Sequence, residues 1–111
     1  MNAHAVTSLL PAELDSLRFQ PLREGVEIHV LHDAPDRSRV AILRYQPGAE
    51  VPAHRHDGYE YVYVLEGEQS DERGRYGAGA FVVNEPGSSH RVTSDGGCVV
   101  LIVWQRPVAF L

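Results

Sequence analysis

Short apolar runs separated by turn residues organise most of the chain. Glycine and proline recur at brief intervals, and β-branched or aromatic residues fill the segments between them. Segments of this length and composition, bounded by turn residues, are typical of β-strands, and several at close spacing indicate a sandwich or barrel. The predicted strands cover residues 26–32, 40–46, 60–66, 81–84, 90–94 and 98–105.

One segment near the N-terminus has a different pattern. Residues 11–18, PAELDSLR, begin with proline and carry two leucines that fall on one helical face. The polar, glycine-rich segment 70–79 is expected to form a loop or hairpin that joins two halves of the fold. We therefore predict an all-β domain at 19–111, preceded by an N-terminal arm at 1–18 with a short helical segment.

Composition and charge limit the partners of such a domain. The chain has 111 residues, which fits one domain, and its net charge is −5 without any basic cluster. Nucleic acid is therefore an unsuitable partner, and no apolar run approaches the roughly 18 residues that span a bilayer. The N-terminus lacks a signal-peptide pattern, and the single Cys98 cannot form an internal disulfide. We expect a cytoplasmic protein with no nucleic-acid or membrane partner.

The stretch HRHDGYE at 54–60 carries the candidate chemistry. On an extended segment, His54 and His56 project to the same side because residues two apart share a face. Glu60 follows an Asp-Gly turn, which can bring its carboxylate beside the two imidazoles. His90 opens another predicted strand and can complete the group. Histidines with a carboxylate suit non-haem iron, and also zinc, manganese, nickel or copper.

The other three histidines have no partners at ligand spacing. His4, His29 and His32 are therefore interpreted as ordinary surface or partly buried residues.

At this point the sequence resembles the two motifs of the cupin superfamily. The first motif is glycine, five residues, His-x-His, three or four residues, glutamate, six residues and glycine, and residues 48–67 match every fixed position. The second motif, glycine, five residues, Pro-x-Gly, two residues, histidine, three residues and asparagine, is matched by 79–94 with two departures. Glu85 stands where proline is usual, and Ser94 replaces asparagine.

Finer phrases resemble the ChrR-like cupins, which include the C-terminal domain of the ChrR anti-sigma factors. These phrases are PGAEVPAHRH, SDERGRYGAGAF, PGSSH and GGC, and the resemblance runs from about Phe19 to the C-terminus. It implies a double-stranded β-helix, the RmlC-like jelly roll. It also implies one divalent transition-metal ion bound by His54, His56, Glu60 and His90, and iron and zinc are the favoured metals. The preceding residues have no Cys/His cluster, so we do not carry over sigma-factor binding.

Strand parity gives expectations for the inner and outer faces. With Glu60 inward, Tyr59, Tyr61 and Tyr63 point outward, and both faces of the predicted strand 98–105 are apolar. A second copy of the chain can cover these outer residues, so we predict a homodimer. The alternative is that the N-terminal segment packs over the tyrosines.

Parity also bears on the ligand. Arg55 and Arg91 have the wrong parity to point inward, so no fixed positive charge is expected in the cavity. This argues against an anionic substrate.

Two functions from different classes are compatible with this site. The first is a dioxygenase-type enzyme that acts on a small diketone- or enol-like molecule, with no catalytic residue assigned beyond the ligands. The alternative is a regulatory or sensing cupin without catalysis, in which zinc is structural or responds to reactive oxygen and Cys98 is an accessory. The simpler interpretation of Cys98 is a small buried hydrophobic residue. A metal-stabilised fold with no reaction of its own is a third option.

Overall fold

The computed structural model describes residues 3–6 and 9–111, and this part of the chain forms ten β-strands and one short 3₁₀ helix, η1 (Pro11–Ser16). The strands are β1 (Gln20–Arg23), β2 (Val26–Asp33), β3 (Arg39–Tyr45), β4 (Ala49–Arg55), β5 (Glu60–Asp71), β6 (Gly74–Gly77), β7 (Phe81–Asn84), β8 (Ser89–Ser94), β9 (Cys98–Trp104) and β10 (Ala109–Phe110). This arrangement confirms the predicted all-β class.

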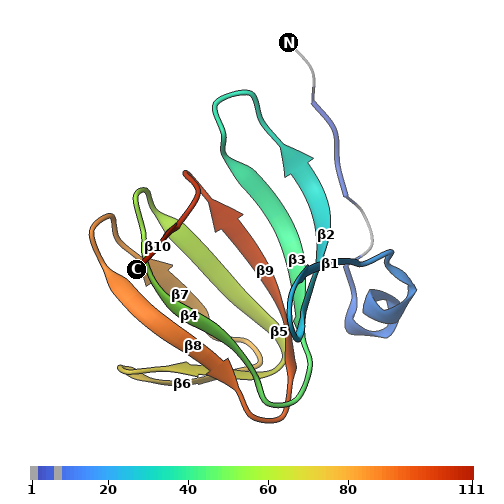
Figure 1. Ribbon diagram of the computed structural model, residues 1–111. Coiled ribbons are helices and arrows are strands. Elements are labelled where there is room, and N and C mark those ends of the chain that lie inside the picture. The colour runs from blue at the N-terminus through green and yellow to red at the C-terminus, as the bar shows by residue number, and fades with distance from the viewer. Residues whose placement is uncertain (1–2, 7–8) are drawn as a thin grey trace.

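Every strand pair is antiparallel, and β5 joins the two halves of the fold. The strand order is β1-β2-β3-β9-β5-β8-β4-β10, with β6 and β7 also paired to β5. The first half of β5 pairs with β9 and β7, whereas its last residues pair with β6 and β8. The sheet therefore curls over itself, and the two halves lean together in Figure 1. The predicted jelly roll is confirmed.

The main core lies between the two halves of the curled sheet. Alternation along β5 buries Val62 and Val64, which are 2% and 1% exposed, as their parity with Glu60 predicts. The core residues are Val26, Ile28, Ala41, Leu43, Tyr45, Ala49, Val62, Val64, Val92, Cys98, Val100 and Ile102.

A second, smaller cluster covers part of the outer face. Leu14 of η1 packs with Ile42 of β3 and Val99 of β9, so the N-terminal segment shields one apolar side of β9. The outward tyrosines are not in this cluster: Tyr59 and Tyr63 remain 38% and 39% exposed. The N-terminal segment thus covers β3 and β9 rather than the tyrosines, and the homodimer stays a prediction.

Several boundaries differ from the sequence-based expectations. The helical segment is a 3₁₀ helix that ends at Ser16, and residues 70–79 form the tight β5–β6 hairpin. Strands β1 and β4 were not predicted as whole elements, because each contains a proline, which lacks the N–H that a ladder needs. No helix within residues 3–6 and 9–111 is long and apolar enough to cross a membrane.

Candidate metal centre

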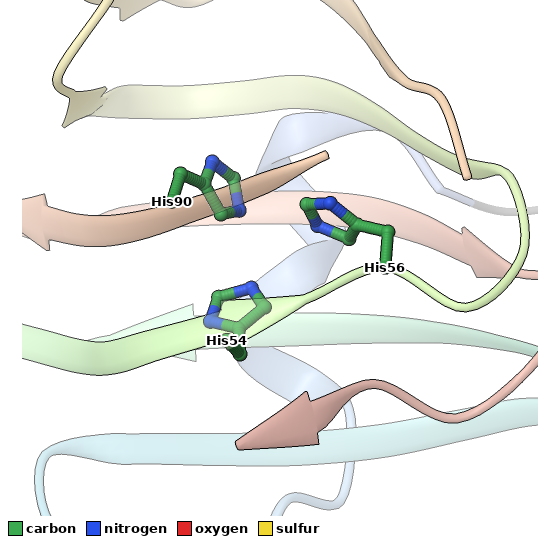
Figure 2. A group of neighbouring side chains, drawn as sticks. All are labelled: His54, His56 and His90. Carbon is green, nitrogen blue, oxygen red and sulfur yellow. The ribbon is translucent and has the colours of Figure 1, made fainter. Parts of the chain in front are cut away.

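Three histidines from two adjacent strands meet inside the jelly roll (Figure 2). His54 lies near the end of β4, His56 follows that strand, and His90 of β8 is the register partner of His54. Their ring centroids lie 4.7 to 5.2 Å apart, and one nitrogen from each ring lies within 4.8 Å of the others. All three side chains are buried, so the structure brings together three potential ligands from distant parts of the sequence.

The Nδ1 atom of each ring is already engaged. In His54 it lies 2.8 Å from the carbonyl oxygen of Pro52, and in His56 it lies 3.0 Å from that of Ser88. In His90 it lies 2.9 Å from Oδ2 of Asp71. Because carbonyl and carboxylate oxygens accept hydrogen bonds, Nδ1 is the protonated nitrogen in each ring. In the neutral form of each ring, Nε2 therefore keeps its lone pair.

These Nε2 atoms have the character of metal ligands. The Nε2 atoms of His56 and His90 are buried and have no hydrogen-bond partner, which is costly for polar atoms unless another group binds them. Burial lowers the pKa of His54 below its ordinary value, which favours the neutral form that binds a metal ion. Ligating histidines usually donate their other N–H to a protein oxygen, as all three do. The three histidines can therefore hold a metal ion.

Glu60 lies beside the three histidines but is not part of the group whose ligand atoms all lie within 4.8 Å of one another. Its Oε1 is 3.4 Å from Nε2 of His56, which is long for a hydrogen bond, and both atoms carry lone pairs. Burial opposes ionisation of Glu60, but a hydrogen bond from His56 and charge interactions with the three imidazoles, each when it carries a second proton, hold the pKa of the carboxyl below its ordinary value. An ionised carboxylate facing an imidazole lone pair is an arrangement that a cation between them would stabilise.

The Glu60 carboxylate is held on both oxygens. Asn84 donates to Oε1 at 3.0 Å, and the indole of Trp104 donates to Oε2 at 2.8 Å. Asn84 in turn accepts a hydrogen bond from Arg73, which also contacts Asp71 at 3.4 Å. Since Asp71 is the partner of His90, a continuous polar network runs from Glu60 to His90 and fixes both side chains.

A cavity of about 270 Å³ is lined by His54 and His90. Most of its walls are apolar inner-face residues, and Trp104 is among them. Phe81 does not line the cavity and is 63% exposed. Arg55 and Arg91 do pair outward, with Asp57 and Glu50. The expectation of a cavity without positive charge is nevertheless wrong: its lining includes Arg23, Arg37 and Arg39.

Arg39 differs from this expectation because side-chain parity was applied only to the arginines next to the candidate ligands. Arg39 is in phase with Ala41, Leu43 and Tyr45, the inward-facing residues of β3, so its side chain starts on the inner face. The same alternation rule, applied to β3, would have identified it.

The remaining candidates lie away from the three histidines. The rings of His4 and His32 lie 5.1 Å apart, and Nδ1 of His29 contacts the carbonyl oxygen of Arg18. Cys98 is part of the main core, and burial raises the pKa of its thiol. This environment agrees with the simpler interpretation of Cys98 as a buried small side chain.

Sequence reasoning missed most of the residues that orient the site. Asp71, Ser88 and Asn84 are not at ligand spacing. Asp71 and Ser88 reach the histidines, and Asn84 reaches Glu60, only because β5, β7 and β8 converge. A partial signal was present for Asn84: it is in phase with inward residues on β7 and lies opposite Glu60.

Comparisons with known proteins agree with this architecture. The ChrR cupin-like domain family matches residues 8–109. The anti-sigma-E factor ChrR of Cereibacter sphaeroides is 31% identical over 100 residues, which cover 87% of this chain and 46% of that protein. The chain therefore spans about half the length of this curated relative.

Solved structures show the same fold. The complex of Rhodobacter sphaeroides SigE with the anti-sigma ChrR matches with a TM-score of 0.75 and 28% identity, over 82% of this chain and 51% of that chain. An acetylacetone dioxygenase from Acinetobacter johnsonii matches with a TM-score of 0.82 and 17% identity, over 100% of this chain and 80% of that chain. The latter likeness is one of fold alone.

Proposed function

The chain belongs to the ChrR cupin-like domain family, and on this premise we propose that it is a mononuclear metal-dependent enzyme of the dioxygenase type that acts on a small organic molecule. The Nε2 atoms of His54, His56 and His90 would hold one divalent transition-metal ion, with Glu60 as a fourth ligand through Oε1. The observation that carries the proposal is the convergence of three buried imidazoles, two of which, His54 and His90, line a largely apolar cavity.

The protein's own residues would do the positioning. When bound, a ferrous ion supplies Lewis-acid and redox chemistry toward oxygen and an oxygen-bearing substrate. Pro52, Ser88 and Asp71 hold the three rings through Nδ1, and Trp104 holds Glu60. The apolar inner wall packs on the carbon skeleton of the substrate and limits the access of water.

The cavity supports a small ligand rather than a polymer. Its volume of about 270 Å³ lies just below the roughly 300–1,000 Å³ that is usual for pockets that take drug-sized molecules. A 1,3-diketone or its enol fits the chemistry, because two oxygens can meet a metal while short alkyl ends contact the apolar wall. The acetylacetone dioxygenase neighbour shows that this fold is compatible with such chemistry, and at 17% identity no more than that.

Metal analysis followed by oxygen uptake tests this proposal. Untagged protein is purified without chelators or nickel resin, its metal content is measured, and anaerobically iron-loaded protein is mixed with pentane-2,4-dione in an oxygen electrode. We expect near-stoichiometric metal and substrate-dependent oxygen uptake, with both lost in His56→Ala. Iron-loaded protein that consumes no oxygen with any of a panel of short diketones and enols contradicts the enzymatic proposal.

A regulatory role is the second candidate, and one observation favours it. The chain is 31% identical to a protein named as an anti-sigma factor, although it spans only 46% of that protein. In this alternative the metal ion is zinc and the cupin responds to a reactive oxygen species without catalysis. Tightly held zinc, no oxygen uptake, and release of the zinc by peroxide would support it over the enzyme.

We also propose that the chain forms a homodimer. The outer face of β5 and β7 carries stacked aromatic rings, with Tyr59–Tyr61 and Tyr61–Phe81 centroids 6.0 and 6.2 Å apart. Phe81 and Val83 are 63% and 47% exposed there, and such apolar surface usually meets a partner. Light scattering at micromolar concentration tests this, and a monomeric mass contradicts it.

A further inference from the structure

The charges that line the cavity do not match a neutral substrate. Arg23, Arg37 and Arg39 line it, and among the described residues Glu60 is the only acidic side chain in the lining. Glu60 is already bonded to Asn84 and Trp104 and lies beside the histidines. The three arginines therefore have no compensating carboxylate inside the cavity.

Arg39 has the most informative position of the three. It is the register partner of Trp104 on β9, and Trp104 is the register partner of Glu60 on β5. Residues in such a cross-strand row share one face, so Arg39, Trp104 and Glu60 line the cavity in sequence from its far side toward the histidines. Arg39 thus lies two strands away from Glu60, the candidate metal ligand.

The hydrogen-bond donors of Arg39 are incompletely used. Its Nε is buried and has no hydrogen-bond partner, and the nearest carboxylate oxygen, Oδ1 of Asp33, is 3.5 Å away on a largely exposed side chain. The Arg39 side chain as a whole keeps 36% of its surface exposed. A buried guanidinium N–H without an acceptor is costly, and an anionic group entering the cavity would satisfy it.

Arg23, at the end of β1, also lines the cavity. Its guanidinium carbon lies 4.4 Å from the centroid of the Phe110 ring, and that ring lies 5.7 Å from the ring of His54. The aromatic contact orients the guanidinium by its face and leaves its N–H edges available for a ligand. No described carboxylate lies within ion-pair distance of Arg23 in residues 3–6 and 9–111.

We propose that the ligand of this cavity is a small organic acid whose carboxylate is bound by Arg39. This inference deepens the proposed function and rests on it for the other end of the ligand, where the oxygen-bearing group faces the histidines. The apolar wall between the two ends takes a short alkyl segment. The substrate class is therefore an oxo- or enol-containing carboxylic acid rather than a neutral diketone.

Paired probes that differ only in charge test the proposal. Zinc-loaded protein is titrated by calorimetry with 4,6-dioxoheptanoate and with its methyl ester, which keeps the diketone and removes the charge. A hydrogen bond to a charged group is considerably stronger than one between neutral groups, so we expect the acid to bind about tenfold or more tightly than the ester. Arg39→Gln should bring the two affinities together, because it weakens binding of the acid more than binding of the ester.

An exposed arginine provides the matched control. Arg75 pairs with Glu68 at 3.6 Å and does not line the cavity, so Arg75→Gln should keep the preference for the acid. Equal binding of acid and ester by the wild-type protein, or a preference that survives Arg39→Gln, overturns the arginine site and leaves the metal proposal standing.

A second pair of probes separates the two proposals. 4-Methylpentanoate and 4-methylpentanamide have the same shape and no diketone, so their binding does not depend on the diketone chemistry. A preference for the carboxylate that Arg39→Gln removes supports the anion site even if neither diketone binds. Loss of bound metal in the wild-type protein would count against the proposed function alone, and no preference in either pair of probes overturns the present inference.

Discussion

Nδ1 of His90 and Oδ2 of Asp71 lie 2.9 Å apart, and both side chains are 3% exposed. Asp71 comes from the β5–β6 hairpin, whereas His90 comes from β8, so the contact ties the hairpin to the candidate metal centre. The ionised carboxylate keeps the proton on Nδ1, which directs the lone pair of Nε2 toward His54 and His56. Asp71 therefore orients His90, a candidate metal ligand, through Nδ1 and does not contact the Nε2 atom that faces the metal site.

Asp71→Asn should weaken metal binding without removing it. An amide can still accept from Nδ1 but carries no charge, and loss of such outer partners typically costs about 10–100-fold in metal affinity. Competition with a chromogenic zinc chelator measures the change. Asp95→Asn, at an 81% exposed side chain, is the control, and equal affinities in the two variants would contradict the assigned role.

Removing two histidines should abolish the site. His54→Ala/His56→Ala is expected to lose stoichiometric metal and to unfold at a lower temperature, because a metal ion bound only by the folded state adds to its stability. Inductively coupled plasma mass spectrometry and calorimetry give the two readouts. His29→Ala, whose ring contacts a backbone carbonyl on the outer side of β2, should match the wild type. A double variant that keeps its metal would show that the constellation is misassigned.

Glu60→Gln distinguishes a ligand from a hydrogen-bond acceptor. The amide keeps the size of the side chain and can still accept from Trp104, but it supplies a much poorer ligand than a carboxylate. If Glu60 is the fourth ligand, zinc affinity should fall by at least tenfold, whereas Trp104→Phe should produce a smaller loss. Unchanged affinity in Glu60→Gln would leave a three-histidine site with Glu60 outside it.

The sequence predicted those features of the structure that depend on residues close together in the chain. Alternation placed Val62 and Val64 inside and the tyrosines outside, since a strand's faces depend only on neighbours two residues apart. The resemblance to the cupin motifs predicted that His54 and His90 lie in one metal site, and sequence spacing alone does not specify this proximity. Contacts such as Asn84 to Glu60 depend on the register between strands, so no local pattern identifies them.

Arg39 illustrates a different limit. Its inward direction was predictable from the alternation of β3, but its unused Nε became visible only with the position of Asp33 and the cavity in place. A sequence reports which face a charge begins on, and it does not report whether the charge finds a partner there.

Cys98 should react slowly with thiol reagents. Burial among apolar side chains raises the pKa of its thiol, so the reactive thiolate is scarce at neutral pH and stays scarce above the pH at which an exposed cysteine ionises. Folded protein mixed with 5,5′-dithiobis(2-nitrobenzoate) should therefore react much more slowly than urea-unfolded protein, at pH 7 and at pH 8.5. Fast stoichiometric reaction of the folded form would instead support a role for Cys98 as a redox-active residue of a sensing domain.

Gly67→Ala should destabilise the fold at the point where β5 passes from one half of the sheet to the other. Gly67 has φ of +71°, and a Cβ there would clash with the carbonyl oxygen of Gly97 and lie 2.9 Å from Cα of Cys98. The left-handed backbone alone costs an alanine about 1–2 kcal/mol, and the clash with backbone atoms adds to that cost. Urea denaturation should therefore show a free energy of unfolding at least about 2 kcal/mol lower. Gly77→Ala is the matched control, because no atom lies within 4 Å of its added Cβ and its φ is not positive. Equal stabilities of the two variants would mean that the β5–β9 corner relaxes to accept a side chain, and that Gly67 does not fix the crossing.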